Sequence, residues 1–148
     1  MPDIINQLPA ILSTFGLAFF YFIAAIPAGV ALNLSPVIAA ITAWASYSAG
    51  VALVIAVGAP LRNWLMKRFN ISTERDPSKL IWRIWDRYGL IGLSLLAPVT
   101  VGAQIGALLG ISMGVKPRSL LIGLSLGVVV WCVGIMLAVM LGLNVIQG

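Results

Sequence analysis

The sequence predicts an all-α integral membrane protein made of two inverted repeats, each a re-entrant helical hairpin followed by a transmembrane helix, with a cytoplasmic amphipathic segment joining them. Of the 148 residues, 61% are hydrophobic and 9% are charged, which is too little polarity for a water-soluble surface. Residues 4–61, 88–115 and 119–148 contain no charged side chain, and each run exceeds the about 20 apolar residues that a spanning helix needs. A proline-containing motif also recurs 81 residues along the chain. We therefore expect residues 1–148 to form a single membrane domain.

The first element is expected to be a hairpin over about residues 8–34, which turns around residues 19–22 and enters from the outside. A full span from about Ile4 to Ile26, broken at Pro27, fits nearly as well, because no charge marks either flank of this segment. The amino-terminal MPDIINQ has no positive region before the apolar run, so we expect the run to be retained rather than cleaved as a signal peptide.

The next element is a transmembrane helix over about residues 37–60, which completes a first repeat of residues 1–61. Pro36 suits the first turn of this helix, since proline lacks only an amide proton that has no partner there. The helix runs into Arg62, Lys67 and Arg68, and basic residues flanking a membrane segment mark its cytoplasmic side. This helix should therefore end in the cytoplasm.

The linker over residues 62–87 carries most of the charge, and we expect it to lie on the cytoplasmic leaflet. Asp76 and Pro77 suit the start of an amphipathic helix. The candidate interfacial anchors are Trp64, Trp82, Trp85, Tyr88, Arg83 and Arg87. A partner-binding helix would have a similar pattern. The net charge of +5 is explained by orientation signals beside apolar runs, so nucleic acid is not an expected partner.

The second repeat, residues 88–148, is predicted to open with a re-entrant hairpin over about residues 89–115. This run has basic residues at both ends, Arg87 before it and Lys116 and Arg118 after it, so both ends should be cytoplasmic. Two full crossings need about 40 residues, whereas the 28 residues from 88 to 115 extend only about 42 Å as a helix. The chain should turn near Pro98–Gly102 and return as a helix from Ala103. The alternative is one long tilted helix kinked at Pro98.

The last element is a transmembrane helix over about residues 118–143, which starts on the cytoplasmic side. Its beginning aligns with the motif around residue 29 when the chain is shifted by 81 residues. The matched pairs are Gly29 and Gly110, Val30 and Ile111, Leu32 and Met113, Asn33 and Gly114, Pro36 and Pro117, and Ile41 and Ile122. Since one spanning helix ends in the cytoplasm and the other begins there, the copies should be inverted, as in many transporters.

The hairpin turns suggest a polar pathway, because backbone groups without helical partners must be buried in protein or face a watery cavity at membrane depth. The candidate pathway residues are Pro27, Gly29, Asn33, Pro98, Thr100, Gly102 and Gln104. Polar side chains in apolar helices also commonly bond to neighbouring helices, and that reading stays open.

Glycines spaced by four residues predict close helix packing. The expected contact glycines are Gly102, Gly106, Gly110 and Gly114 on the returning arm, and Gly123 and Gly127 on the last helix. Cys132 stands alone in an apolar stretch and should pack as a small hydrophobic residue.

The residues that the sequence lacks exclude several functions. The chain has no histidine, which removes the commonest metal ligand and general base. No carboxylate lies between Asp3 and Glu74 or beyond Asp86, so a carrier that titrates a buried intramembrane acid is not expected. No nucleophile occurs with its base, and we expect no cofactor, no metal and no enzymatic activity.

Three stretches have a familiar pattern: IAAIPAGVALNLSPVIAAI, YGLIGLSLLAPVTVGAQIGALLGI and LLIGLSLGVVV. Their most specific pieces are Ala25-Ile26-Pro27, Tyr88-Gly89, Gly102-Ala103 and Gly106-Ala107-Leu108. With these pieces the chain resembles the small multidrug export family, whose fold is similar to that of DedA-type (VTT-like) membrane proteins. The resemblance implies a small integral membrane protein with two re-entrant elements. The family usually carries an acid and an arginine just before Gly-Ala-Ile-Pro, whereas this chain has Tyr21 and Ile23, so a role of that pair in ion coupling or headgroup binding would be lost.

Together these features predict a transporter that moves a small amphiphile, lipid carrier or solute through a site formed by the re-entrant segments. The alternative is a non-transporting structural or assembly subunit of a larger membrane complex. The expected partners are membrane lipids and either a second copy of the chain or other membrane proteins. The expected location is the bacterial inner (plasma) membrane or an equivalent internal membrane.

Overall fold

The protein is all-helical over the residues that the computed structural model describes, 2–68 and 80–147. The helices are α1 Pro2–Phe20, α2 Phe22–Ala31, α3 Pro36–Arg68, α4 Leu80–Thr100, α5 Gly102–Ser112 and α6 Pro117–Gln147. Two segments are long and apolar enough to cross a membrane, Pro36–Val57 in α3 and Pro117–Ile146 in α6. They correspond to the two spanning helices that the sequence predicts.

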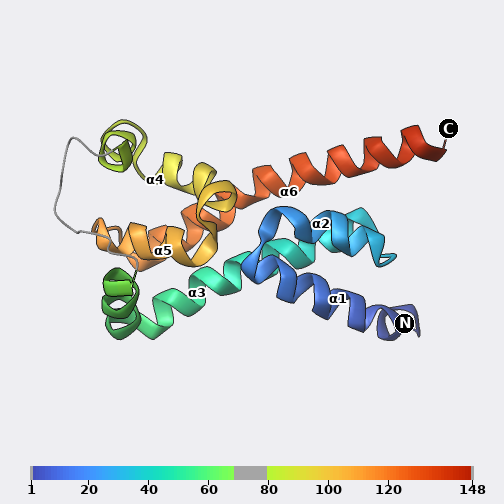
Figure 1. The fold of residues 1–148 in the computed structure, drawn as a ribbon, viewed down its shortest axis with the longest axis horizontal. Coiled ribbons are helices and arrows are strands. Elements are labelled where there is room, and N and C mark those ends of the chain that lie inside the picture. Colours follow the sequence, from blue (N-terminus) through green and yellow to red (C-terminus); the bar gives the residue numbers. More distant parts are fainter. Residues whose placement is uncertain (1, 69–79, 148) are drawn as a thin grey trace.

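The helices are arranged around a crossing of α3 and α6 (Figure 1). α3 runs towards the end of the molecule where α4 begins, and α6 runs back from that end, so the two long helices point in opposite directions. The α1–α2 pair and the α4–α5 pair extend from opposite ends of the molecule, and each has its helix break near the middle. The two helix breaks therefore face each other across the centre.

The helix breaks lie at Tyr21 and Val101. Tyr21 separates α1 from α2 with φ −141° and ψ 80°, and Pro27 lies within α2, so the chain is not broken at Pro27 as the alternative expected. Pro98 lies within α4, and α5 begins at Gly102 and packs back against α4. Residues 88–115 are thus two contacting helices rather than one long kinked helix.

Two glycine kinks extend the helices into the linker. The sequence predicted a helix ending near residue 60, but α3 continues to Arg68 through a kink at Gly58, where φ is 63° and ψ is −142°. α4 has a matching kink at Gly89, with φ 54° and ψ −140°. Glycine reaches these dihedral angles without a side-chain clash, so the helix changes direction and then resumes. The predicted helix start at Asp76 lies outside the described residues.

The turns that follow α2 and α5 are built in the same way. In the first turn, the donors are the amides of Leu32, Asn33 and Leu34, which lie 2.9–3.0 Å from their acceptor carbonyls. In the second turn, the donors are the amides of Met113, Gly114 and Val115, at the same distances. Each donor and each acceptor of the second turn lies 81 residues after its counterpart in the first. The acceptors are Ala28, Val30 and Gly29 in the first turn, and Leu109, Ile111 and Gly110 in the second. Asn33 (φ 67°) and Gly114 (φ 83°) both adopt the left-handed conformation, which ends the helix. The pairing of residues by the 81-residue shift thus extends to backbone geometry.

The core is made of small side chains, which let the helices approach closely. Its buried alanines include Ala25, Ala39, Ala43, Ala97, Ala103 and Ala107. A Cβ on Gly106 would lie 2.7 Å from Ala97 Cβ, and one on Gly127 would lie 2.6 Å from the Ser94 carbonyl carbon. These contacts join α4 to α5 and to α6. They therefore hold the α4–α5 pair against the long helix α6. Gly110 against Leu120 and Gly123 against Ser94 and Leu90 make further contacts. Cys132 is buried, as expected of a small hydrophobic residue.

Gly102 and Gly114 do not have the packing role that the sequence predicted. A Cβ on Gly114 would meet nothing within 4 Å, and one on Gly102 would lie 3.7 Å from Gln104 Oε1, within its own helix. Both residues have positive φ and occupy helix ends. Their spacing of four from Gly106 and Gly110 therefore reflects turn conformation rather than a continuous contact face.

Candidate functional site

The two helix breaks meet at a small cavity, which we call the tip pocket. It has a volume of about 160 Å³ and is lined by Phe20, Tyr21, Phe22 and Ile23 from the first break and by Pro98, Val99, Thr100, Val101 and Gly102 from the second. The pocket is smaller than the roughly 300 Å³ typical of the smallest drug-sized sites. It could therefore hold the polar group of a ligand but not a whole amphiphile.

A hydrogen bond between the two halves of the chain joins the two helix breaks, which we also call the tips. Gln104 Nε2 donates to the Phe19 carbonyl at 2.7 Å, which joins the start of α5 to the end of α1. Gly50 of α3 makes room for this contact, since a Cβ there would lie 3.3 Å from both Ala103 Cβ and Gln104 Nε2. The side chain of Gln104 thus satisfies a carbonyl that the end of α1 leaves unpaired.

The carboxyl ends of α1 and α4 and the amino ends of α2 and α5 lie near the tip pocket. Carbonyls near the two carboxyl ends accept hydrogen bonds, whereas the two amino ends have no side-chain cap. Tyr21 N donates to the Leu17 carbonyl at 2.7 Å and Val101 N to the Ala97 carbonyl at 3.1 Å. Trp131 Nε1 donates to the Leu95 carbonyl at 2.7 Å. By contrast, neither Tyr21 nor Val101 caps the following helix with its side chain. The amino ends of α2 and α5 therefore present N–H groups and positive partial charge near the pocket.

The crossing of α3 and α6 carries a bond between two residues related by the 81-residue shift. Trp44 Nε1 donates to the Ser125 carbonyl at 3.0 Å, and the two residues are 81 positions apart. This bond therefore joins α3 to α6 at two positions that have the spacing of the recurring sequence motif.

A family model described as "Putative small multi-drug export protein" matches residues 21–134. The chain belongs to this small multidrug export family. The match begins at the first helix break and extends well into α6, so it contains all of the tip pocket except Phe20. With its two apolar spans, this family member is a membrane protein. No curated protein and no solved structure matches it.

In this family member, the predicted pathway residues separate into two groups. Pro98, Thr100 and Gly102 line the tip pocket, and Gln104 bonds beside it. The Thr100 hydroxyl donates to the Leu96 carbonyl at 2.8 Å, so its proton is used within α4.

The remaining candidates, Pro27, Gly29 and Asn33, do not reach the pocket. Asn33 lies in the turn between α2 and α3, at the end of α2 remote from the tip. Gly29 packs against α1 and α3, since a Cβ there would lie 2.9 Å from Thr14 Oγ1 and 3.0 Å from Ala39 Cβ. Pro27 is an exposed residue inside α2. Gly29 therefore acts in packing and Asn33 in turn formation, and none of the three residues lines the tip pocket.

Sequence reasoning did not include the first-half wall of the pocket, Phe20–Ile23, among the pathway residues. The comparison with the family pattern did single out Tyr21 and Ile23, but only as positions where an expected charged pair is absent. Because these four residues are all aromatic or aliphatic, their types give no sign of a polar site. Only the symmetry argument, which put a turn at residues 19–22, could have found them.

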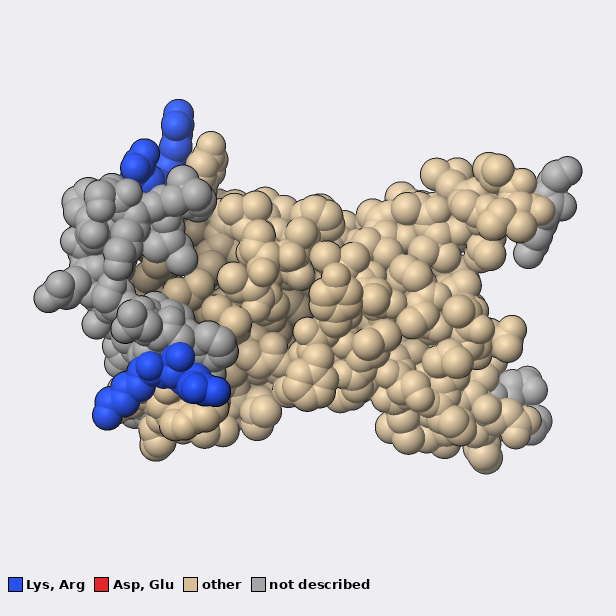
Figure 2. Space-filling model, viewed as in Figure 1, with Lys and Arg blue, Asp and Glu red and all other residues tan. Residues whose placement is uncertain are grey.

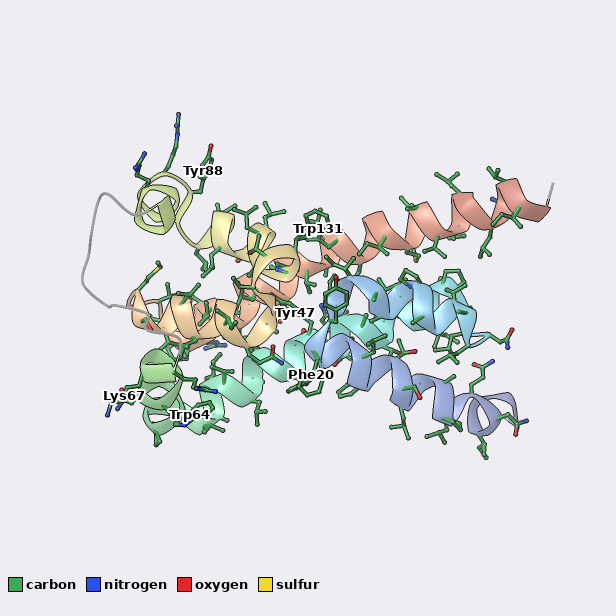
Figure 3. The ribbon with its side chains drawn as sticks, viewed as in Figure 1. Phe20, Tyr47, Trp64, Lys67, Tyr88 and Trp131 are labelled. Carbon is green, nitrogen blue, oxygen red and sulfur yellow. The ribbon has the colours of Figure 1, made fainter. Side chains whose placement is uncertain are left out.

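Basic and aromatic side chains lie together at one end of the molecule, which we call the basic end. Figure 2 shows Lys and Arg in two groups at the end where α3 ends and α4 begins. Among the side chains that the structure describes, the exposed basic ones are Lys67, Arg68, Arg83, Arg87, Lys116 and Arg118. Trp64 and Tyr88 are 60% and 58% exposed, and both lie at this end (Figure 3). The side chains of Trp82 and Trp85 lie outside the described residues.

Proposed function

We propose that this protein is a membrane transporter in which the two hairpins re-enter the bilayer from opposite sides and the tip pocket takes the polar part of the transported molecule. The transported molecule would be a small amphiphile, a lipid carrier or a solute. The tip pocket carries this proposal, because its lining residues come from both helix breaks and the breaks lie near the middle of the molecule (Figure 1). Broken helices that meet near the midplane are the usual location of transporter binding sites.

The proposal treats the two halves as inverted repeats. The matching turn hydrogen bonds after α2 and α5, 81 residues apart, support two copies of one structural unit. The opposite directions of α3 and α6 support their inversion (Figure 1). The bond between Trp44 and Ser125, which are related by the same shift, supports an axis through the α3–α6 crossing.

The orientation follows from the basic end. The exposed Lys and Arg side chains of the described residues gather at one end of the molecule, and such clusters mark the cytoplasmic side of membrane proteins. On this basis the linker over residues 62–87 is cytoplasmic, the α4–α5 hairpin enters from the cytoplasm, and the α1–α2 hairpin enters from the opposite side.

Transport can be tested with the purified protein in lipid vesicles. The vesicles carry either a fluorescent phospholipid or a lipophilic cation, and the protein should accelerate the crossing of at least one of them. Ile23 lines the tip pocket, so Ile23→Trp should fill it and slow the crossing at least tenfold. Ile122 is 51% exposed on α6 and does not line the pocket, so Ile122→Trp is the matched control and should transport normally. No protein-dependent crossing of any probe would refute the proposed function.

The alternative function is that of a non-transporting assembly subunit, and one observation favours it. Only 11% of the most apolar part of the α6 span is buried, compared with 50% for the α3 span. Much of α6 is therefore open to lipid, to a second copy or to another membrane protein. Mass measurement after extraction in mild detergent distinguishes the cases, because a stable and active monomer would exclude an obligate assembly role.

A further inference from the structure

The hydroxyl of Tyr47 is a buried polar group without a partner. The side chain is 1% exposed, and its Oη has no hydrogen bond to any described residue. Tyr47 lies near the centre of the span Pro36–Val57, and Figure 3 places it near the middle of the long axis of the molecule. At this depth a hydroxyl has no bulk water to bond with, and an unsatisfied buried hydroxyl is destabilising.

The other hydroxyls show why Tyr47 differs. Several donate to the carbonyl four residues earlier in their own helix: Ser13 to Pro9, Thr14 to Ala10, Ser94 to Leu90, Thr100 to Leu96 and Ser112 to Leu108. Ser48 Oγ also lacks a partner, but a rotation about χ1 would bring it to the Trp44 carbonyl. The Tyr47 hydroxyl is at the far end of a rigid ring and cannot reach its own helix backbone. A phenylalanine would pack equally well at this position.

Tyr47 contacts one of the residues that line the tip pocket. Its ring makes an edge-to-face contact with the ring of Phe22, with centroids 5.7 Å apart and an interplanar angle of 72°. Phe22 is the first residue of α2 and lines the tip pocket. The Phe22 side chain therefore contacts Tyr47 and also lines the pocket.

The groups around the pocket suit a hydrogen-bond acceptor rather than a cation. The amino ends of α2 and α5 lack side-chain caps and present N–H groups there, and the phenol of Tyr47 would add an O–H donor. No Asp or Glu occurs in residues 4–61 or 88–115, so a cationic ligand would have no counter-charge at this depth.

We infer that Tyr47 and the tip pocket form one binding site for the hydrogen-bond-accepting polar group, such as a phosphate, of an amphiphile, and that Phe22 separates the two parts until the ligand enters. The inference rests on the proposed function, and it narrows the transported class from a small amphiphile, lipid carrier or solute to amphiphiles with a hydrogen-bond-accepting polar group. The apolar chain of such a ligand would remain in the lipid beside the helices, since the pocket is too small to enclose it.

The test compares Tyr47→Phe with Tyr88→Phe. The first removes the buried hydroxyl and leaves the ring, and the second removes the same atom from an exposed residue at the basic end. In vesicles, Tyr47→Phe should slow the crossing of fluorescent phosphatidylglycerol at least tenfold, whereas Tyr88→Phe should match the unmodified protein. The midpoint of thermal unfolding of Tyr47→Phe should be unchanged or higher, because no bond within the protein is lost.

A binding measurement separates the site from the transport activity. In maltoside micelles, dodecyl phosphate should raise the thermal midpoint of the unmodified protein and of Tyr88→Phe but not of Tyr47→Phe, and dodecyltrimethylammonium should raise none of them. A normal crossing rate for Tyr47→Phe, or a dodecyl phosphate shift equal to that of the unmodified protein, would overturn the inference. A lowered thermal midpoint of Tyr47→Phe without ligand would also overturn it, because it would show that the hydroxyl has a partner in the protein. If the unmodified protein binds dodecyl phosphate through Tyr47 but moves no probe, the proposed function fails and the binding site remains.

Discussion

The close approach of α4 and α6 gives a sharp test of the packing, because it depends on the absence of one methyl group. A Cβ on Gly127 would lie 2.6 Å from the Ser94 carbonyl carbon and 2.8 Å from Ser94 Cβ. Gly134 lies further along the same helix, and a Cβ there would meet nothing within 4 Å. Gly127→Ala and Gly134→Ala therefore make the same chemical change in a closed and an open environment.

The expected stabilities follow from two opposing effects. Overpacking a tight contact costs about 1–3 kcal/mol, and at Gly127 the obstructing atoms are backbone, so the cost should be near 3 kcal/mol. Replacing glycine by alanine within a helix recovers about 1 kcal/mol. Gly127→Ala should therefore destabilise the protein by about 2 kcal/mol, whereas Gly134→Ala should stabilise it by up to about 1 kcal/mol.

The single cysteine provides the assay. Cys132 is 6% exposed and should react much faster once the helices separate, so a thiol-reactive fluorophore can report unfolding during a temperature ramp in mild detergent. At about 2–4 °C per kcal/mol for a chain of this size, Gly127→Ala should lower the midpoint by about 4–8 °C, and Gly134→Ala should raise it by up to about 4 °C. Equal midpoints for the two variants would refute the reasoning, because they would show that α4 and α6 do not meet at Gly127.

Three further substitutions test individual contacts with the same thermal assay. Gln104→Ala leaves the Phe19 carbonyl unpaired and should cost about 1 kcal/mol, and a midpoint equal to that of the unmodified protein would contradict the bond between the tips. Trp44→Phe removes the donor to the Ser125 carbonyl and should cost about 0.6 kcal/mol, the average for hydrogen bonds between membrane helices; no loss would argue against that contact. Asn33→Gly should retain stability and Asn33→Val should lose about 1–2 kcal/mol, because φ is 67° at this position, and a tolerated valine would contradict the left-handed turn.

The sequence allowed the spanning helices to be predicted because charge and apolar length are read directly from it. The run into Arg62, Lys67 and Arg68 marked the end of the first span, although the kink at Gly58 let the helix continue to Arg68. The second helix break was predicted because Pro98, Thr100 and Gly102 all favour a turn. The first break was not visible locally: Tyr21 has neither glycine nor proline beside it, and only the symmetry argument placed a turn near it.

Of the residues that line the tip pocket, the predicted pathway set contained only Pro98, Thr100 and Gly102, and the reason is physical. Residues near Pro98 were found because polar and turn-forming types gather there in the sequence. The opposite wall comes from residues about 80 positions earlier, and the bond between Gln104 and Phe19, 85 residues apart, has no local signature. Tyr47 was missed because a single tyrosine in an apolar run is usually an ordinary core residue. Its unpaired hydroxyl becomes evident only when its neighbours are known.

The central claim is that residues 88–115 enter the membrane and return to the same side, and cysteine labelling tests it most directly. Single cysteines at Arg87, Lys116 and Leu32, all exposed, would be placed in a Cys132→Ala background and treated with a membrane-impermeant maleimide from outside intact cells. We expect the cysteine at position 32 to react, and those at 87 and 116 to react only after the membrane is opened. Labelling of positions 87 and 116 from opposite sides would contradict the re-entrant hairpin and the inverted repeats built on it.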